Sequence, residues 1–358
     1  MTRDDLITAT AAKLRLRRDD FTRVTRVLLV SLVSVAVVVT ISAVPGCGAT
    51  HALLGIHEAP AVAAGSVPLT VDQARLIVSR SFDAAHLGAT TTGAAGARTL
   101  RGAYSSEGLR AMAGRVKLAS VQPLRATSAL RAQHPTLLAV SRGFGFPRFI
   151  IAQTVESDGG LPVLHLLVSP DAATPYRISM SVEMVPPAAV QPFAPLSRGS
   201  LMVTHGTGLV VAPATLLNRY AAGMAFPAKA VAKAPFASDS FSGQVRAGAA
   251  GVAKAVATQA TFTQVHTVVP RSVFTVRQAN GDALVFGVIE RTDTFAVKKG
   301  QSVNTSGSKA FVLLSGKKRI ATRATITTLE FVVFAVPRST GPATLVAARE
   351  QIVAGSGS

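Results

Sequence analysis

The stretch that decides the fold class is Tyr176-Arg177-Ile178-Ser179-Met180-Ser181-Val182-Glu183-Met184. Apolar side chains alternate in it with polar or charged ones, and a period of two places the two kinds on opposite faces of a β-strand. One apolar and one polar face are typical of an antiparallel sheet that covers a core on one side. The pattern therefore predicts a half-buried antiparallel strand over 176–184.

The residues before this strand predict a group of helices followed by strands. Thr70-Val71-Asp72-Gln73 fits a capping box, so a helix is expected to begin there and to end at Gly88. A second short helix is expected over 105–117, with a loop over 89–103 between the two. Apolar runs then predict strands at 136–141, 148–156 and 161–169, the last two flanking a hairpin turn at 157–160.

The second half repeats this order of helices and then strands. Helices are expected over 213–224 and 241–257, and strands over 261–269, 272–278, 283–294, 310–314, 321–336 and 343–353. We therefore expect an α+β fold made of two tandem units related by duplication. The expected boundaries are a first unit at 69–186, a proline-containing linker at 187–207, a second unit at 208–353 and a tail at 354–358.

The N-terminal region predicts export. No charged residue occurs over the 20 residues from Val27 to Gly46, which as a helix would cover about 30 Å, one hydrocarbon thickness. The preceding residues carry seven basic and four acidic side chains, and this basic flank orients the N-terminus toward the cytoplasm. Everything after residue 47 is then extracytoplasmic, with 48–67 as a tether.

The single cysteine of the chain, Cys47, lies where this apolar run ends, in Val44-Pro45-Gly46-Cys47-Gly48. The short apolar residue three positions back and the glycine before Cys47 are similar to a bacterial lipobox, in which the cysteine carries lipid. Residues 1–47 are thus interpreted as a basic leader with a lipoprotein signal peptide. The alternatives are an uncleaved membrane-spanning anchor and ordinary secretion with cleavage near Ala59 to Ala63.

The exported part is basic, with 30 lysine or arginine and 14 aspartate or glutamate side chains after residue 46. Export and the lack of a nucleic-acid-binding motif exclude nucleic acid as partner. Anionic lipid headgroups or wall polymers are the expected counter-surfaces, and an even arginine coat that aids solubility is the alternative. The candidate patch consists of Lys298, Lys299, Lys317, Lys318 and Arg319.

The sequence does not predict an enzyme. It contains neither H-E-x-x-H nor G-x-S-x-G, and no histidine has a partner at metal-ligand spacing, so neither a metal nor a cofactor is expected. His165 lies inside the predicted strand 161–169 and is expected to be packed, or exposed at the rim of the sheet, rather than to bind a ligand.

Several segments together resemble a family of uncharacterised actinobacterial lipoproteins built on a domain of unknown function. Besides the signal that ends at Cys47, they are Leu69–Ala74, Phe146–Ile150, Gly208–Pro213 and Gly281–Phe286. The resemblance covers about residues 69–353 and implies no activity or site residue. The layout of each half is similar to cystatin-like or NTF2-like units, in which N-terminal helices pack on a curved antiparallel sheet.

Three functions compete on these grounds. A membrane-anchored extracytoplasmic protein that binds a ligand or serves as a scaffold in the cell envelope is favoured by the anchor, the basic charge and the absence of a catalytic motif. An envelope enzyme with dispersed catalytic residues would instead bring a histidine and a carboxylate together in a deep pocket. A structural partner of a membrane or cell-wall complex would expose a large apolar patch.

Overall fold

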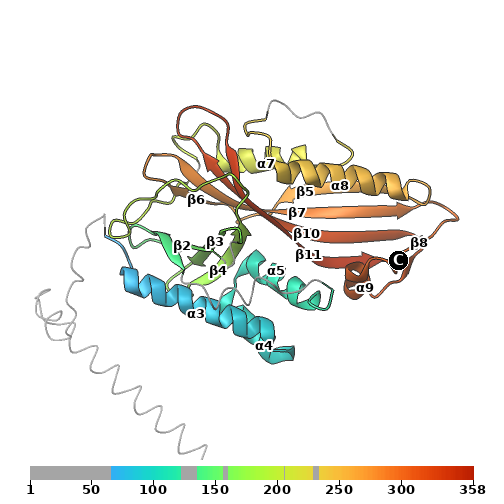
Figure 1. Cartoon of the computed structure of the whole chain (residues 1–358), viewed down its shortest axis with the longest axis horizontal. Helices are drawn as coiled ribbons and strands as arrows, with labels where there is room; N and C mark the ends of the chain where they lie inside the picture. The colour runs from blue at the N-terminus through green and yellow to red at the C-terminus, as the bar shows by residue number, and fades with distance from the viewer. Residues whose placement is uncertain (1–65, 122–134, 156–159, 205, 229–233) are drawn as a thin grey trace, which may run out of the picture. The chain divides into compact units, whose positions relative to one another are not determined.

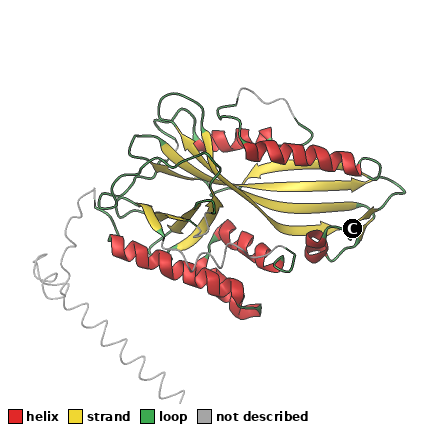
Figure 2. Cartoon of the chain, in the orientation of Figure 1, coloured by secondary structure: helices red, strands yellow, loops and turns green. Residues whose placement is uncertain are grey.

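The computed structural model describes residues 66–121, 135–155, 160–204, 206–228 and 234–358, which belong to one compact unit. These residues form a mixed helix and sheet fold with antiparallel sheets and, in the described part, six helices. The two main sheets have four and five strands (Figures 1 and 2). The leader, the apolar run at 27–46 and Cys47 lie outside the described residues.

The first sheet has the order β1-β2-β3-β4, with every neighbouring pair antiparallel. Its strands are β1 (Thr136–Val140), β2 (Arg148–Thr154), β3 (Val163–Ser169) and β4 (Arg177–Glu183). The predicted hairpin is confirmed, because Arg148 pairs with Ser169 and Thr154 with Val163. Three helices precede this sheet in the chain: α3 (Val71–Thr90), α4 (Gly93–Ala103) and α5 (Ser106–Lys117).

The capping box that begins α3 is confirmed. The Thr70 hydroxyl accepts from the Gln73 backbone N–H, and the Gln73 side chain accepts from the Thr70 N–H. The prediction that Gly88 ends this helix is wrong, since α3 continues to Thr90. A Cβ at Gly88 would lie 2.8 Å from the Leu100 backbone nitrogen, so glycine here permits close packing of α4.

The loop predicted over 89–103 is wrong for most of its length, since α4 occupies 93–103. Its small residues conceal the helical period in the sequence. Leu100 and Ala103 are nevertheless buried against α3 and the sheet, and this tertiary packing stabilises a helix that local propensity does not favour.

The strand predicted over 176–184 is confirmed as β4, but a bulge divides its apolar face. Leu166 pairs with Met180 while Leu167 pairs with Ile178, so one extra residue lies in β4 at Ser179. Ile178 therefore packs toward the helices, whereas Met180 and Val182 face the second sheet. Both faces of the first sheet are therefore covered, whereas the sequence pattern predicted a strand with one face in solvent.

The second sheet has the order β11-β10-β7-β5, and β6 also pairs with β7. β5 and β6 pair with successive parts of β7 on one side of it, so they act as one interrupted strand. The long run predicted over 321–336 forms β10, and its ladder with β11 contains two register shifts. The strands are β5 (Ala260–Val268), β6 (Phe274–Arg277), β7 (Ala283–Val297), β10 (Arg323–Val336) and β11 (Thr344–Gly357).

Helices α7 (Pro213–Gly223) and α8 (Ser240–Val256) precede this sheet in the chain, as predicted. The strand predicted over 310–314 is wrong: these residues lie in helix α9 (Lys309–Ser315). A short apolar run does not distinguish a strand from a helix, and here Phe311 is buried on one side of the helix. α9 lies between the short strands β8 (Val303–Asn304) and β9 (Arg319–Ile320), which pair with each other.

The elements stack as helices, sheet, sheet and helices (Figure 2). One core cluster lies between the two sheets, with Phe149, Leu166 and Met180 facing Phe286 and Phe331. A second cluster lies between α3 to α5 and the first sheet, and a third between α7, α8 and the second sheet. The Met184 to Ala347 bridge joins the end of β4 to β11.

The two halves share an order of helices followed by antiparallel strands. Each half contributes residues to the core between the sheets. The tail predicted over 354–358 is wrong, since β11 continues to Gly357 and pairs there with β10. That the halves are cystatin-like or NTF2-like duplicates, with the other boundaries given above, stays a prediction. Superposing them on one another is the comparison that would decide it.

Candidate functional site

A cleft of about 610 Å³ lies between helix α8 and the second sheet. The α8 side is lined by apolar and small residues, among them Val245, Gly248 and Ala249. A Cβ placed on Gly248 would meet nothing within 4 Å, so glycine leaves room beside the helix at this point. On the sheet side the lining includes Phe262, Gln264, Arg291, Asp293 and Glu350.

Strand register brings the polar side chains of this face together. His266 pairs with Arg291, and Arg291 pairs with Thr328. Directly paired residues project from the same face of a sheet, as do residues two positions apart in one strand. The neighbouring pairs Gln264 with Asp293 and Glu330 with Glu350 therefore add to the same group.

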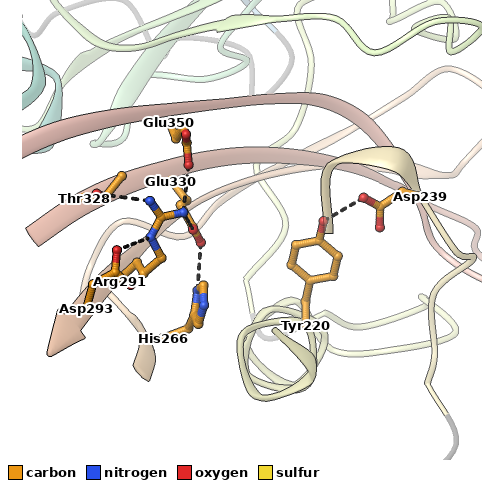
Figure 3. A network of polar contacts seen from close by, with 8 residues as sticks. All are labelled: Tyr220, Asp239, His266, Arg291, Asp293, Thr328, Glu330 and Glu350. Atoms are coloured by element: carbon orange, nitrogen blue, oxygen red, sulfur yellow. Dashed lines mark hydrogen bonds and ion pairs between the residues drawn. The ribbon is translucent and has the colours of Figure 1, made fainter. Parts of the chain in front are cut away.

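These side chains form the charged network shown in Figure 3. Glu330 is its centre: one carboxylate oxygen lies 2.9 Å from His266 Nδ1 and the other accepts from Arg291 Nη1 at 3.1 Å. The same Nη1 donates to Glu350 at 2.7 Å, and Arg291 Nε lies 3.3 Å from Asp293 Oδ2. The side chains of His266 and Glu330 are fully buried, whereas that of Glu350 is half exposed.

Three carboxylates thus surround one guanidinium. Burial lowers the pKa of Arg291, but the charges of Asp293, Glu330 and Glu350 outweigh burial and raise this pKa above its ordinary value. Burial also raises the pKa of Asp293, although the Arg291 charge and a hydrogen bond with the Gln264 side chain act in the opposite direction. Arg291 therefore stays protonated, and its charge compensates carboxylates that would otherwise lie unpaired beneath the cleft.

Four buried polar atoms of this face have no hydrogen-bond partner among the described residues. They are Gln264 Oε1, Asp293 Oδ1, His266 Nε2 and Arg291 Nε, although Arg291 Nε forms the ion pair with Asp293. Buried polar groups in folded proteins are almost always paired, and leaving one unpaired costs about 1–3 kcal/mol. Gln264 and Asp293 line the cleft, and both unpaired atoms are acceptors. A molecule in the cleft that donates hydrogen bonds would complete them.

The start of α8 is held above the cleft by its cap. The Asp239 carboxylate accepts from the Ser242 backbone N–H at 2.7 Å and from the Ser242 hydroxyl at 2.9 Å. The Tyr220 hydroxyl of α7 donates to Asp239 at 3.0 Å, as Figure 3 shows. Burial and the adjacent Asp239 charge raise the pKa of Tyr220, so the phenol remains a donor. This contact ties α8 to α7.

The first sheet also contains a buried histidine. His165 Nε2 lies 2.8 Å from the Thr154 hydroxyl and Nδ1 lies 2.9 Å from the Ser181 hydroxyl. Its ring packs against Phe82, with the ring centres 4.7 Å apart. Burial, together with the Arg349 charge, lowers the pKa of His165 to about 3, so the imidazole is neutral. Of the two expected environments, packed or exposed at the rim, the structure shows the packed one.

The five residues of the predicted basic patch are all exposed. Arg319 lies in β9 and donates to the Ser302 hydroxyl at 2.9 Å, which brings it near the segment that follows Lys298 and Lys299. Whether the patch binds an anionic surface stays a prediction. Cys47, the predicted lipid attachment site, lies outside the described residues.

Sequence reasoning missed the charged network because its members come from four strands. No two of its carboxylates stand at a spacing that suggests a pair. One signal was present: Glu330 interrupts the apolar stretch Leu329-Glu330-Phe331-Val332-Val333. A carboxylate inside a buried strand requires a partner, and this requirement points to a cation from a neighbouring strand.

The sequence profile of a family described as Domain of unknown function (DUF8094) matches residues 145–357, more than half of the chain. The match begins just before β2 and includes the cleft and the charged network. Comparison with curated proteins and with solved structures gives no match. Among the helices of the described residues, none has the length and apolarity needed to cross a membrane.

Proposed function

The chain belongs to the DUF8094 family, and we propose that it is a membrane-anchored extracytoplasmic lipoprotein that binds a small ligand. Its anchor is a lipid on Cys47, and its ligand site is the cleft beneath α8. The protein acts by binding and not by catalysis. The segments that resemble actinobacterial lipoproteins support an origin in that group.

The observation that carries this proposal is the pair of unsatisfied acceptors in the cleft. Gln264 Oε1 and Asp293 Oδ1 are buried without a partner in the described residues, and both side chains belong to the cleft lining. The lining beside them combines apolar side chains, Phe241, Val245 and Phe262, with polar and charged ones, among them Glu183, Gln244 and Arg349. Small-molecule sites combine apolar walls with convergent polar groups that fix the orientation of the ligand. The best fit is an amphipathic molecule with hydroxyl or amine donors.

The contact between His266 and Glu330 favours an enzyme as the second candidate, because a histidine and a carboxylate converge beside a cleft. A general base must, however, come within hydrogen-bond reach of its substrate. Both side chains are fully buried, and neither is part of the cleft lining. The dyad therefore supports the sheet beneath the site, and binding is the function that the geometry favours.

Native mass spectrometry of the full chain, purified from host membranes, tests the proposal. Gly248→Leu places a side chain in the open space of the cleft, while Gly243→Leu makes the same change outside the cleft lining, at another glycine with open space around it. We expect a bound small molecule on the wild-type chain and on Gly243→Leu, and none on Gly248→Leu. Equal recovery from all three chains, or no bound species on any, would contradict ligand binding in this cleft.

The same spectra test the anchor through the mass of the mature N-terminus. A chain that begins at Cys47 and carries added lipid mass is the expected result. A chain that still begins at Met1 with unmodified Cys47 would contradict lipidation and support the membrane-spanning anchor. This result is independent of what the cleft binds.

A further inference from the structure

Residues 298–322 form an insert between β7 and β10, which contains β8, α9 and β9. We call this segment the α9 insert. It carries its own small core, in which Phe311 and Ile320 are buried with Ala324. A Cβ added at Gly355 would lie 3.2 Å from Leu314 Cβ, so α9 packs closely on β11.

The insert encloses an apolar pocket of about 210 Å³. Its apolar lining comes from both the insert and the adjacent strands: Phe295, Val297, Val303, Phe311, Ile320, Ala324 and Ile326. The loop residues Asn304, Gly307 and Ser308 also line the pocket and are exposed, so they form its solvent side. Leu313 of α9 is 42% exposed on the same insert.

The charged side chains of the α9 insert and of the first residue of β10 all have one sign. From Lys298 to Arg323 the chain holds seven lysine or arginine residues and no aspartate or glutamate. Every one of these seven is exposed, and none forms a salt bridge with a carboxylate of the described residues. They are Lys298, Lys299, Lys309, Lys317, Lys318, Arg319 and Arg323.

We infer that the α9 insert binds one anionic membrane lipid, with its acyl chain in the pocket and its phosphate among these cations. An apolar hollow beside unpaired positive charges is complementary to a molecule with an apolar tail and an anionic head. The exposed Leu313 would enter the interface beside it. This inference rests on the proposed attachment of the protein to a membrane. It concerns a pocket that adjoins the cleft beneath α8 and shares Phe295 and Ile326 with it.

The chain contains no tryptophan, so one introduced tryptophan reports its own surroundings. Leu313→Trp places the reporter on α9, and Phe144→Trp places a matched reporter on another residue that is 45% exposed, outside the insert. The full chain is reconstituted into vesicles of phosphatidylcholine, with or without phosphatidylglycerol, and bromine on the acyl chains of one lipid quenches nearby tryptophan. We expect Trp fluorescence at 313 to be quenched about fivefold more strongly by brominated phosphatidylglycerol than by brominated phosphatidylcholine, corresponding to one charge contact.

Two further variants separate the pocket from the charges. Changing Lys298, Lys299, Lys317, Lys318 and Arg319 to Gln removes the preference for phosphatidylglycerol. Ala324→Leu fills the pocket and keeps the charges, so quenching from the acyl chain falls while quenching by a spin-labelled headgroup persists.

Equal quenching by the two brominated lipids would overturn the inference, as would an Ala324→Leu chain that behaves like its parent. Insensitivity to anionic vesicles together with an emission shift on adding soluble dextran sulfate would favour a wall polymer over a lipid. A chain that fails to float with any vesicle shows that the membrane attachment itself is wrong. A chain that floats without lipid preference contradicts the α9 site alone.

Discussion

The two sheets each bury a histidine, and the surroundings of the two rings differ in kind. His165 in the first sheet has both nitrogens beside hydroxyls and its ring against Phe82. His266 in the second sheet contacts Glu330 through Nδ1, and its other ring nitrogen, Nε2, has no partner in the described residues. The ring of His165 is neutral and both of its nitrogens have hydrogen-bond partners. The ring of His266 belongs to a charged network that borders a cleft.

The difference teaches which buried polar group stabilises the fold and which one has capacity left for a ligand. Both ring nitrogens of His165 pair with neutral hydroxyls, so this histidine has no hydrogen-bonding capacity left for a ligand. Around Arg291, charges balance imperfectly and acceptors at Gln264 and Asp293 stay open. Buried polar groups in folded proteins are mostly paired, so the two unpaired acceptors that line the cleft make it a candidate binding site. Other unpaired buried atoms of the described residues, among them Ser141 Oγ, Tyr176 Oη and Ser200 Oγ, lie outside this cleft.

The largest expected effect comes from removing the cation of the second sheet. Arg291→Met leaves Glu330 and Asp293 as uncompensated buried charges, and we expect the free energy of unfolding to fall by about 3–5 kcal/mol. Arg110→Met is the matched control, because Arg110 also contacts two carboxylates, Glu107 and Glu290, but is 45% exposed. The free energy of unfolding of Arg110→Met should fall by no more than about 1 kcal/mol. Urea unfolding measures both, and equal losses would contradict the contrast between buried and exposed networks.

A smaller effect is expected from acid acting on the first sheet. The folded pKa of His165, about 3, lies below its ordinary 6.5, so the unfolded chain binds a proton that the folded chain does not. Above pH 6.5 neither state binds this proton, so the histidine does not affect stability there. As the pH falls from 6.5 toward 3, protonation of the unfolded chain lowers the free energy of unfolding. The slope should approach about 1.4 kcal/mol per pH unit.

Urea unfolding across this pH range, with two variants, checks that assignment. His165→Asn removes the titrating ring and should flatten the slope. Ser181→Ala removes one hydroxyl partner, keeps the ring and should retain the slope. A slope that is unchanged in His165→Asn would place the acid sensitivity elsewhere.

The same contrast explains what the sequence could predict. The period-two strand over 176–184, the capping box at Thr70 and the hairpin between 148 and 169 are local patterns, and all three are found in the structure. The helix α4 was missed because the glycines of 93–103 give it a low local helix propensity. The helix α8 was predicted from its own residues, but the cleft depends on how α8 packs on distant strands. His165 was interpretable from its own strand. His266 was not, since its partners Glu330 and Arg291 come from other strands.

The most direct test of the central claim compares the loss of one acceptor in each sheet. Gln264→Leu removes an unpaired oxygen from the cleft, together with the hydrogen bond between the Gln264 side chain and Asp293. Thr154→Val removes a hydroxyl that pairs with His165. Native mass spectrometry of the two full chains from host membranes then measures the bound small molecule. We expect Gln264→Leu to bind the small molecule about tenfold more weakly than the wild-type chain, which corresponds to the loss of one hydrogen bond of about 1.4 kcal/mol. We expect Thr154→Val to bind it as the wild-type chain does. Equal occupancy in both variants would contradict the account that the open acceptors of the second sheet hold a ligand.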